Sequence, residues 1–391
     1  MFKHFRHAIH MFASATKDFL VLRGFWRVRS TIDYAFLVHP RDVADVHAKY
    51  PFLRHVGEGA TLWLMKHFWP VRVAPIHGLL SNKGEELHGW VLACPYTATQ
   101  LMEDRELARR AILATARLAR KFGAKVIGLG ALTASLSRGG LDVSEHIKDV
   151  TVVTGRFYTV VNICGLVHKS VEALGLDSSK VRVAVVGVAG SIGAGVAQLL
   201  VRQGICHIQI IDIVDKFDEV KRVQGYIKDI NPQVDVQVYS KLMTPLQADI
   251  VVTATNRPDA LIERKHLLPG TVVVDDAQPS DVADELFEDP SYLILEGGVV
   301  HAPSMYIPFA LGLQQKGDIF SCLGELLLIM QGDISIASPL GRELHLNFQL
   351  VDALTNAAHA MQFTPGDFQN QYKLYNEADV ARVRSIRATR T

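Results

Sequence analysis

A glycine-spaced turn constrains the fold of this chain more than any other feature. Residues 181–186 form a nearly unbroken valine run, typical of a strand buried on both faces of a parallel sheet. Glycines follow at G-x-x-G-x-x-G spacing, and residues 191–203 then have the pattern of a helix. A strand, glycines and a helix in this order predict the phosphate-binding turn of a Rossmann domain, where backbone amides approach a pyrophosphate. The predicted turn consists of Gly187, Val188, Ala189, Gly190, Ser191, Ile192 and Gly193.

Asp212 bears on the choice of cofactor. It lies near the end of the second predicted strand, 207–213, about where an acidic residue binds the ribose 2′-hydroxyl. A carboxylate favours NADH because it repels the 2′-phosphate of NADPH, whereas Lys216 and Lys221 are near enough in sequence to meet such a phosphate. Asp212 is alternatively an ordinary strand-end residue. The sequence therefore predicts NADH or NADPH and leaves the choice open.

Two polar segments follow later strands at the edge where a nicotinamide would bind. Strand-like runs at 234–238, 250–254, 271–275 and 292–295 alternate with helical segments. Ligands of an open parallel sheet bind outside the carboxyl ends of its strands. The segments, which line a nicotinamide pocket or are plain strand-to-loop turns, are Thr253, Ala254, Thr255 and Asn256, and Asp275, Asp276, Ala277, Gln278 and Pro279.

The whole pattern indicates an α/β protein with a Rossmann-like, doubly wound parallel sheet, an N-terminal α/β substrate domain and C-terminal helices. The expected parts are a basic amphipathic segment (1–30), the substrate domain (31–155), the Rossmann domain with its lead-in helix (156–300), a helical region (301–365) and a tail (366–391), mobile at its basic end. Residues 105–121 are predicted as a helix and 137–155 as a turn and loop.

The first thirty residues combine aromatic side chains with six Lys or Arg against one acid, Asp18. One interpretation is an amphipathic segment that lies on an anionic membrane surface. The other is a helix that packs on the protein's own core and presents a solvated basic face. No apolar run approaches the roughly 18 residues that a membrane-spanning helix needs.

Charge and cysteine usage exclude several classes of protein. The formal net charge is +1, whereas a general nucleic-acid binder would be strongly basic. The four cysteines, at 94, 164, 206 and 322, have no metal-ligand spacing. We therefore expect no nucleic-acid partner, no metal and no disulfide scaffold. A cytoplasmic location follows, with membrane association only under the first interpretation of the N-terminal segment.

Cys322 is the candidate nucleophile. Asp318 precedes an apolar run at 319–330 and is predicted as a helix N-cap, which places Cys322 near the first turn. The positive end of a helix lowers the pKa of a thiol and favours the reactive thiolate. Glu325, three residues on, shares a face with Cys322 and is a candidate proton relay. The alternative is a buried, inert cysteine, the commoner case for a lone cysteine in an apolar helix.

Several segments, taken in chain order, resemble the long-chain acyl-(acyl-carrier-protein) reductases of cyanobacteria. The resemblance runs over roughly residues 85 to 332. The segments that carry it are Gly128-Leu129-Gly130-Ala131-Leu132-Thr133, Thr154-Gly155 with 159–164, the turn 187–193, Leu295-Glu296-Gly297-Gly298-Val299-Val300 and Phe320-Ser321-Cys322.

The resemblance implies reduction of a fatty acyl thioester, on acyl carrier protein or coenzyme A, to a fatty aldehyde. Cys322 takes the position of the family's nucleophile, which would receive the acyl group before hydride transfer. Thr154, Thr255 and Ser321 are hydroxyls that can stabilise the oxyanion, and the sequence does not choose among them.

Two departures from the family concern the cofactor and an acid/base residue. The family typically has an arginine where this chain has residues 212–214, and Glu-His where it has His301-Ala302. His301 is therefore a candidate acid/base residue or an ordinary loop histidine. Two other functions stay open: a shikimate-dehydrogenase-like oxidoreductase without covalent catalysis, and a non-catalytic dinucleotide-binding regulator. The first usually has a Lys/Asp pair in its N-terminal domain, and nothing marks Lys125 and Asp142 as one.

Overall fold

The computed structural model describes residues 2–28, 32–256, 260–309, 311–332, 334 and 337–390, without the side chains of 2–11 and 214. The chain forms two compact units. Unit 1 comprises Met1–Gly155, Ser304–Gly312 and Cys322–Gly341, and unit 2 comprises Arg156–Pro303, Leu313–Ser321 and Arg342–Thr391. The predicted boundary between residues 30 and 31 lies outside the described residues. The predicted helical region 301–365 is instead shared between the two units.

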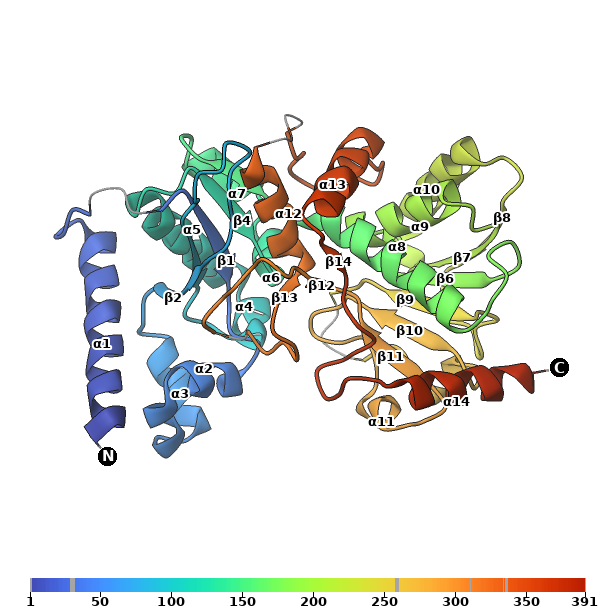
Figure 1. The fold of residues 1–391 in the computed structure, drawn as a ribbon, viewed down its shortest axis with the longest axis horizontal. Helices are drawn as coiled ribbons and strands as arrows, with labels where there is room; N and C mark the ends of the chain where they lie inside the picture. Colours follow the sequence, from blue (N-terminus) through green and yellow to red (C-terminus); the bar gives the residue numbers. More distant parts are fainter. Residues whose placement is uncertain are drawn as a thin grey trace. The chain divides into compact units, whose positions relative to one another are not determined.

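Unit 1 is built on a five-stranded sheet (Figure 1). Its strands lie in the order β2-β3-β1-β4-β5, and all neighbours are parallel except β2 and β3. The carboxyl ends of β1, β4 and β5 therefore lie at one edge. The strands are β1 (Tyr34–Val38), β2 (Val71–Ile76), β3 (Gly89–Ala93), β4 (Val126–Leu129) and β5 (Thr151–Val153).

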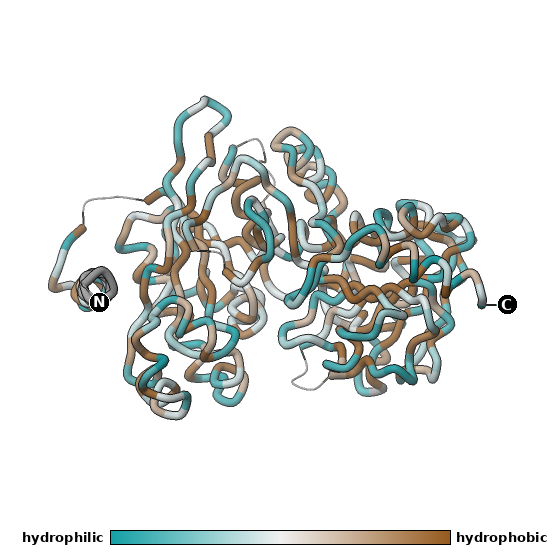
Figure 2. Tube along the Cα trace, turned by 60° about the horizontal axis from the view of Figure 1, so that its bottom comes forward, coloured by the Kyte–Doolittle hydropathy of each residue, from teal (hydrophilic) through white to brown (hydrophobic). Residues whose placement is uncertain are grey.

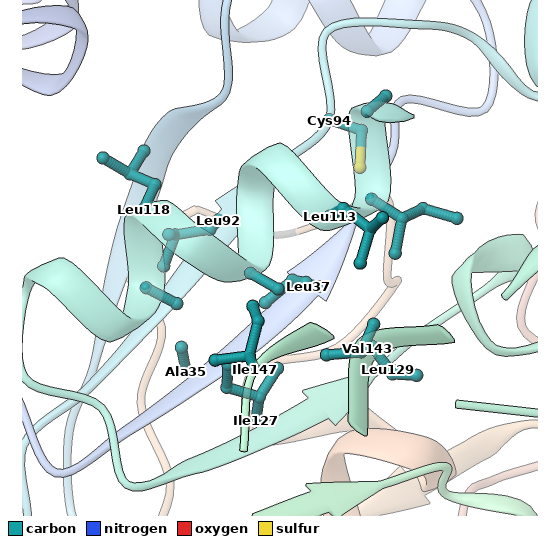
Figure 3. Packing of buried hydrophobic residues seen from close by; sticks show 14 of the residues in the cluster. Ala35, Leu37, Leu92, Cys94, Leu113, Leu118, Ile127, Leu129, Val143 and Ile147 are labelled. Carbon is teal, nitrogen blue, oxygen red and sulfur yellow. The ribbon is translucent and has the colours of Figure 1, made fainter. Parts of the chain in front are cut away.

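The helices of unit 1 are α1 (Phe2–Arg23), α2 (Val43–Lys49), α3 (Glu58–Met65), α4 (Ala98–Glu103), α5 (Arg105–Lys121), α6 (Leu132–Leu136), α7 (Leu141–His146) and, from its second residue, α12 (Ser321–Gln331), with a 3-10 turn η1 (Pro51–His55). Helix α5 has the predicted bounds. Asp104 caps it by accepting hydrogen bonds from the backbone N–H groups of Glu106 and Leu107. Figure 3 shows its apolar face packed with strand residues such as Leu37 in the core of unit 1.

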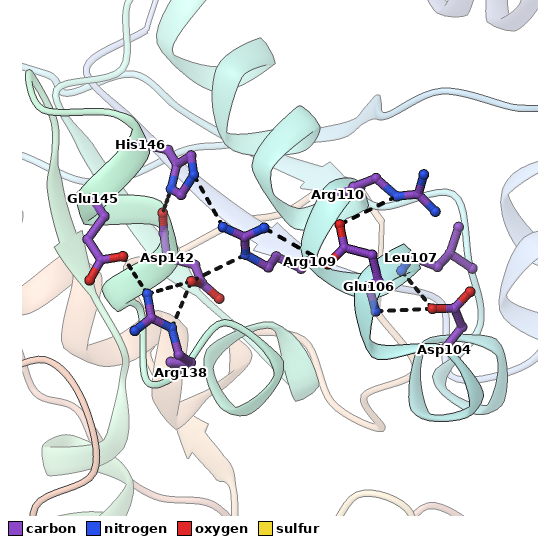
Figure 4. Close-up of polar contacts among 9 residues, drawn as sticks. All are labelled: Asp104, Glu106, Leu107, Arg109, Arg110, Arg138, Asp142, Glu145 and His146. Carbon is purple, nitrogen blue, oxygen red and sulfur yellow. Dashed lines mark hydrogen bonds and ion pairs between the residues drawn. The ribbon is translucent and has the colours of Figure 1, made fainter.

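A buried carboxylate anchors α7, which lies in the stretch predicted as a loop. Asp142 is buried between Arg138 and Arg109, at 2.7 and 3.4 Å (Figure 4). Burial raises the pKa of Asp142, but the hydrogen bonds and charges of the two arginines outweigh burial and lower it. The turn predicted at 137–139 is present, but the loop predicted from there to residue 155 is wrong, since α7 and β5 both lie in it. Helix α7 has only six residues, and Asp142 and Glu145 are charged, so its apolar pattern is too short to predict a helix.

The second half of α1 packs on unit 1. Ala15, Asp18 and Val21 are buried, and the Asp18 carboxylate pairs with the Arg72 guanidinium at 2.7 Å. The Trp69 indole N–H donates to the Ala15 carbonyl oxygen. These contacts agree with a helix packed on the protein's own core and lend no support to a membrane-surface role for this half. Among the described residues, no helix has the length and apolar character needed to span a bilayer.

Unit 2 contains a six-stranded sheet whose neighbours are all parallel. The strands lie in the order β11-β10-β9-β6-β7-β8. The chain thus starts in the middle, winds to one edge and returns, as a doubly wound Rossmann sheet does, with the switch point between β6 and β9. The strands are β6 (Arg182–Val186), β7 (His207–Ile211), β8 (Asp235–Tyr239), β9 (Ile250–Thr253), β10 (Val272–Asp275) and β11 (Leu293–Glu296).

Helices cover both faces of this sheet, and the predicted Rossmann fold is confirmed. Figure 1 shows α8, α9 and α10 on one face and α11 and α14 on the other, and in Figure 2 the enclosed strands are largely hydrophobic. The helices are α8 (Arg156–Ala173), α9 (Ser191–Arg202), α10 (Phe217–Ile230), α11 (Asp284–Phe287), α13 (Phe348–Ala360) and α14 (Glu377–Ala388), with 3-10 turns η2 (Val214–Lys216) and η3 (Arg264–His266).

The C-terminal part of unit 2 differs from the prediction in two ways. A small antiparallel sheet joins β12 (Val299–His301) to β13 (Asp318–Phe320) and β14 (Thr364–Pro365) within a stretch predicted as helical. The basic end of the chain, predicted as a mobile tail, forms α14 instead. Arg387 pairs there with the buried Asp249 at 2.8 Å, and Val383 is fully buried. Burial of Val383 and pairing of Arg387 with a carboxylate hold α14 in place.

Candidate functional site

The glycine turn after β6 has the geometry of a dinucleotide cradle. Gly187 has a φ of +89°, and a side chain there would lie 2.6 Å from the Ala254 carbonyl oxygen at the end of β9. A side chain at Gly193 would lie 2.5 Å from the Gly187 carbonyl oxygen. Glycine is therefore required at both positions, and Gly190 caps α9, whose first amides point out of the helix. These residues fit a nicotinamide dinucleotide whose pyrophosphate meets the N-terminus of α9.

Asp212 lies beside this turn, just beyond β7. Its carboxylate accepts hydrogen bonds from the backbone N–H groups of Ala189 and Ile213, both at 2.8 Å, and the Lys216 ammonium lies 3.8 Å away. The carboxylate therefore shapes the turn as well as placing negative charge where the ribose is expected. Asp212 therefore has a structural role in the turn, and its contact with a ribose stays a prediction.

Thr253 is the last residue of β9, and Ala254 and Thr255 follow it at the switch point. The Thr253 hydroxyl donates to Asp275 at 2.6 Å, and the Thr255 hydroxyl donates to Asp281 at 2.5 Å. Both hydroxyls therefore hold the loops at this edge in place. Whether this segment lines a nicotinamide pocket stays a prediction.

Asp276 follows β10 at the same edge. Burial, together with the charges of Asp275 and Glu296, raises the pKa of Asp276 well above its usual range. A side chain on Gly298 would lie 3.1 Å from Asp276 Oδ1 and 3.8 Å from Ser321 Oγ, so the Gly298 backbone lies between them. The Asp276 carboxyl and the Ser321 hydroxyl thus both face the Gly298 backbone. Within the described residues, no group of three or more His, Cys, Asp or Glu side chains is placed to hold a metal ion.

The α8 helix positions this part of unit 2. Asn162 donates two hydrogen bonds through Nδ2, to the carbonyl oxygens of Gly297 and Val299 at 2.7 and 3.0 Å. The hydroxyls of Thr159 and Ser321 lie 2.8 Å apart. Polar side chains at positions 159 and 162 of one helix thus fix the turn before β12 and the residue that precedes Cys322.

His301 belongs to an oriented acid/base arrangement. Its Nδ1 lies 3.0 Å from Asp318 Oδ1, and Gln369 donates through Nε2 to Asp318 Oδ2 at 2.6 Å. The Asp318 side chain is 1% exposed and that of His301 is 42% exposed. An Nδ1–H that donates to the Asp318 carboxylate would orient the ring and leave Nε2 as its acceptor nitrogen. The prediction that Asp318 caps α12 is wrong, because Asp318 lies in β13 and its carboxylate is engaged by His301 and Gln369.

Cys322 is the second residue of α12 and belongs to unit 1 with Glu325. A side chain on Gly155, where φ is +79°, would overlap the Cα and Cβ atoms of Cys322. Farther along α12, a side chain on Gly128 of β4 would lie 2.8 Å from Leu326. Two close backbone approaches therefore hold the helix that carries Cys322. The thiol is partly exposed, as a nucleophile must be.

Glu325 and two of the other cysteines are buried. Glu325 is fully buried and accepts a hydrogen bond from the Ser338 hydroxyl at 3.2 Å. Cys94 and Cys164 are buried, and burial raises the pKa of each thiol, for Cys94 to about 11. These two cysteines are therefore unreactive core residues. Sequence reasoning gave Asp318 only a capping role and missed Gln369, because only the fold brings both residues to His301.

Comparison with known sequences finds a family model that matches part of the chain and a protein that matches most of it. Residues 166–293 match the family model described as shikimate / quinate 5-dehydrogenase. Over 297 residues the chain is 22% identical to a long-chain acyl-(acyl-carrier-protein) reductase of Synechococcus elongatus, covering 73% of this chain and 84% of that protein. The chain is thus a distant relative of nicotinamide-dependent oxidoreductases. The predicted cofactor, NADH or NADPH, agrees with that relationship.

Solved structures with similar folds are remote. L-tryptophan dehydrogenase from Nostoc punctiforme is 13% identical, with a TM-score of 0.37 over 92% of this chain and 89% of that one. Quinate dehydrogenase from Corynebacterium glutamicum in complex with NAD is 12% identical, with a TM-score of 0.31 over 84% of this chain and 100% of that one. Likeness at this level supports no conclusion about function.

Proposed function

We propose that this chain reduces the acyl thioester of a fatty acid to an aldehyde, with Cys322 as the nucleophile. The thioester is carried by an acyl carrier protein or by coenzyme A. The observation that carries the proposal is Cys322, partly exposed in the first turn of α12 with its backbone against Gly155. The 22% match to a long-chain acyl-(acyl-carrier-protein) reductase supports the same reaction.

In the covalent step one sulfur atom acts as the nucleophile and then carries the acyl group, and the Cys322 thiolate does both. Its Sγ attacks the thioester carbonyl carbon, a C–S bond forms, and the π electrons move to oxygen. The oxyanion collapses, the bond to the carrier sulfur breaks, and the carrier leaves as a thiolate that takes up a proton. The nicotinamide cofactor, when bound, supplies a hydride. Loss of the Cys322 thiolate from the resulting thiohemiacetal then releases the aldehyde.

Residues of unit 2 have the chemistry for the remaining tasks. The turn from Gly187 to Gly193 would hold the dinucleotide. His301, with Nδ1 held by Asp318, has a basic Nε2 that takes up or gives a proton. We assign it the acid/base role, with Asp318 as a positioning residue. Glu325 keeps a secondary role as a proton relay.

A shikimate-dehydrogenase-like enzyme without covalent catalysis is the second candidate. The match of residues 166–293 to the shikimate / quinate 5-dehydrogenase model favours it. The expected Lys/Asp pair gains no support, because the carboxylate of Asp142 is engaged by Arg138 and Arg109. A non-catalytic regulator would keep the glycine turn and tolerate loss of Cys322.

Intact-protein mass spectrometry separates these functions. Purified protein is mixed with a long-chain acyl thioester in the absence of nucleotide. The expected result is a mass gain of one acyl group that Cys322→Ser abolishes and Cys206→Ser, a partly exposed thiol in unit 2, leaves unchanged. NADH or NADPH should then discharge the adduct as aldehyde, and the faster one identifies the cofactor. Absence of an adduct with several acyl thioesters, in protein that still binds nucleotide, would reject covalent catalysis.

A further inference from the structure

Thr154, at the carboxyl end of β5, carries a buried hydroxyl with no hydrogen-bond partner in the described part of the chain. The residue is 6% exposed. Leaving a buried hydroxyl unpaired costs stability, so such groups are rare and are often kept for function. The hydroxyl therefore needs an explanation outside the folded chain itself.

The neighbour of Thr154 leads to Cys322. Thr154 immediately precedes Gly155, the residue whose backbone lies against the Cα and Cβ atoms of Cys322 in unit 1. A hydroxyl shielded from water, one residue from the backbone that contacts a partly exposed cysteine, has the setting of an oxyanion donor, because low water content strengthens the hydrogen bond.

The other two hydroxyls that compete for this role are already engaged. The Thr255 hydroxyl donates to Asp281, and the hydroxyls of Ser321 and Thr159 lie 2.8 Å apart. Recruiting Thr255 would break its hydrogen bond to Asp281, and Ser321 already shares one with Thr159, in which either hydroxyl can be the donor. Thr154 differs from both because its hydroxyl has no hydrogen-bond partner among the described residues.

We propose that the Thr154 hydroxyl donates a hydrogen bond to the oxygen of the acyl group on Cys322, an inference that rests on the proposed function. When Sγ adds to the thioester carbonyl, the oxygen gains the π electron pair and becomes an oxyanion. The Thr154 O–H donates to that oxygen without transferring its proton. The same hydrogen bond stabilises the thiohemiacetal oxyanion before that species collapses to aldehyde, so both tetrahedral species are stabilised.

The variant Thr154→Val removes the hydroxyl and keeps the shape of the side chain. Acylation of Cys322 by a long-chain acyl thioester is followed by mass spectrometry without nucleotide. We expect the acylation rate to fall about 100- to 1,000-fold, the usual effect of losing one oxyanion donor. Melting temperature should be unchanged or higher, since no hydrogen bond is lost, and nucleotide affinity should be unchanged. Thr154→Ser should restore most of the rate.

A matched control is Thr115→Val, a fully buried threonine of α5 whose hydroxyl donates to the Ala111 carbonyl oxygen. It should leave the acylation rate unchanged. Acylation of Thr154→Val at the rate of the unmodified protein would overturn the inference alone, and so would a lowered melting temperature, which would reveal a structural partner. Absence of an adduct in the unmodified protein would overturn the proposed function and the inference with it.

Discussion

Gly155 lies against Cys322 so closely that the glycine has no room for a side chain. Its φ of +79° is also a conformation that residues other than glycine rarely adopt. The turn after β5 and the first turn of α12 therefore define each other's position within unit 1. This contact places the candidate nucleophile at the carboxyl edge of the sheet of unit 1, where ligands of parallel sheets bind.

Gly155→Ala should displace Cys322 and reduce acylation. A displacement of about 1 Å can cost roughly 100-fold in rate, and we expect a loss of at least that order. The acylation rate from mass spectrometry and the dissociation constant for nucleotide are the two measurements, and the second should not change.

The control for Gly155→Ala is Gly57→Ala, also in unit 1. Gly57 has a φ of +84°, but a side chain there meets no atom within 4 Å. Gly57→Ala therefore has the same backbone strain from a positive φ but no steric clash, and we expect its acylation rate to be unchanged. Equal acylation rates for Gly155→Ala and Gly57→Ala would mean that the contact between Gly155 and Cys322 is not needed for acylation.

Asp318→Asn should uncouple His301 and destabilise unit 2. The Asp318 carboxylate accepts from His301 and Gln369 at once, whereas an asparagine has one oxygen and leaves a donor unpaired. We expect a loss of about 1–3 kcal/mol in the free energy of unfolding and an altered pH dependence of reduction. Urea denaturation and the pH–rate profile measure the two effects.

The exposed pair of His207 and Asp235, at 3.3 Å, is the matched control for Asp318→Asn. Its histidine side chain has the same 42% exposure as His301, but its aspartate is 53% exposed instead of buried. Asp235→Asn should change the free energy of unfolding by no more than about 0.5 kcal/mol. A cost as small for Asp318→Asn would remove the basis for a positioning role.

Asp276→Asn should stabilise the protein at neutral pH. The pKa of Asp276 is raised above the ordinary 3.8, so the folded state favours the protonated form. Its stabilising contribution is complete below the ordinary pKa and is lost as pH rises through the folded-state pKa. An asparagine has no proton to lose, so the Asp276→Asn variant avoids the loss of stability that ionisation of Asp276 causes. Melting temperatures across pH should show a gain at neutral pH that vanishes near the ordinary value.

Asp367→Asn is the opposite case and serves as the control for Asp276→Asn. A hydrogen bond from Gln315 and the Lys169 ammonium lower the pKa of Asp367, so its contribution is present above the ordinary pKa and lost in acid. The asparagine variant should therefore melt lower at neutral pH. A higher melting temperature at neutral pH in both variants would contradict a pKa of Asp276 raised by burial and like charge.

Local patterns were enough to predict the elements with strong periodicity or fixed turn chemistry. The bounds of α5 were predicted correctly, as was the order of β6, the glycine turn and α9, because helix period and glycine spacing are local properties. Short elements with mixed patterns were missed. Helix α7 and strand β5 lie in a predicted loop, and α14 lies in a predicted tail, because distant carboxylates and arginines hold α7 and α14.

The sequence by itself determined that this chain has a nicotinamide-dinucleotide turn and a cysteine near a helix start, since both depend on residues adjacent in the chain. Only the tertiary structure decided which side chains meet. His301, Asp318 and Gln369 come from separate segments that antiparallel pairing and loop closure bring together, and no local spacing encodes their contact. In the same way, the hydroxyl of Thr154 became distinct from those of Thr255 and Ser321 only when burial and hydrogen-bond partners were known, because satisfaction of a polar group depends on its neighbours in space.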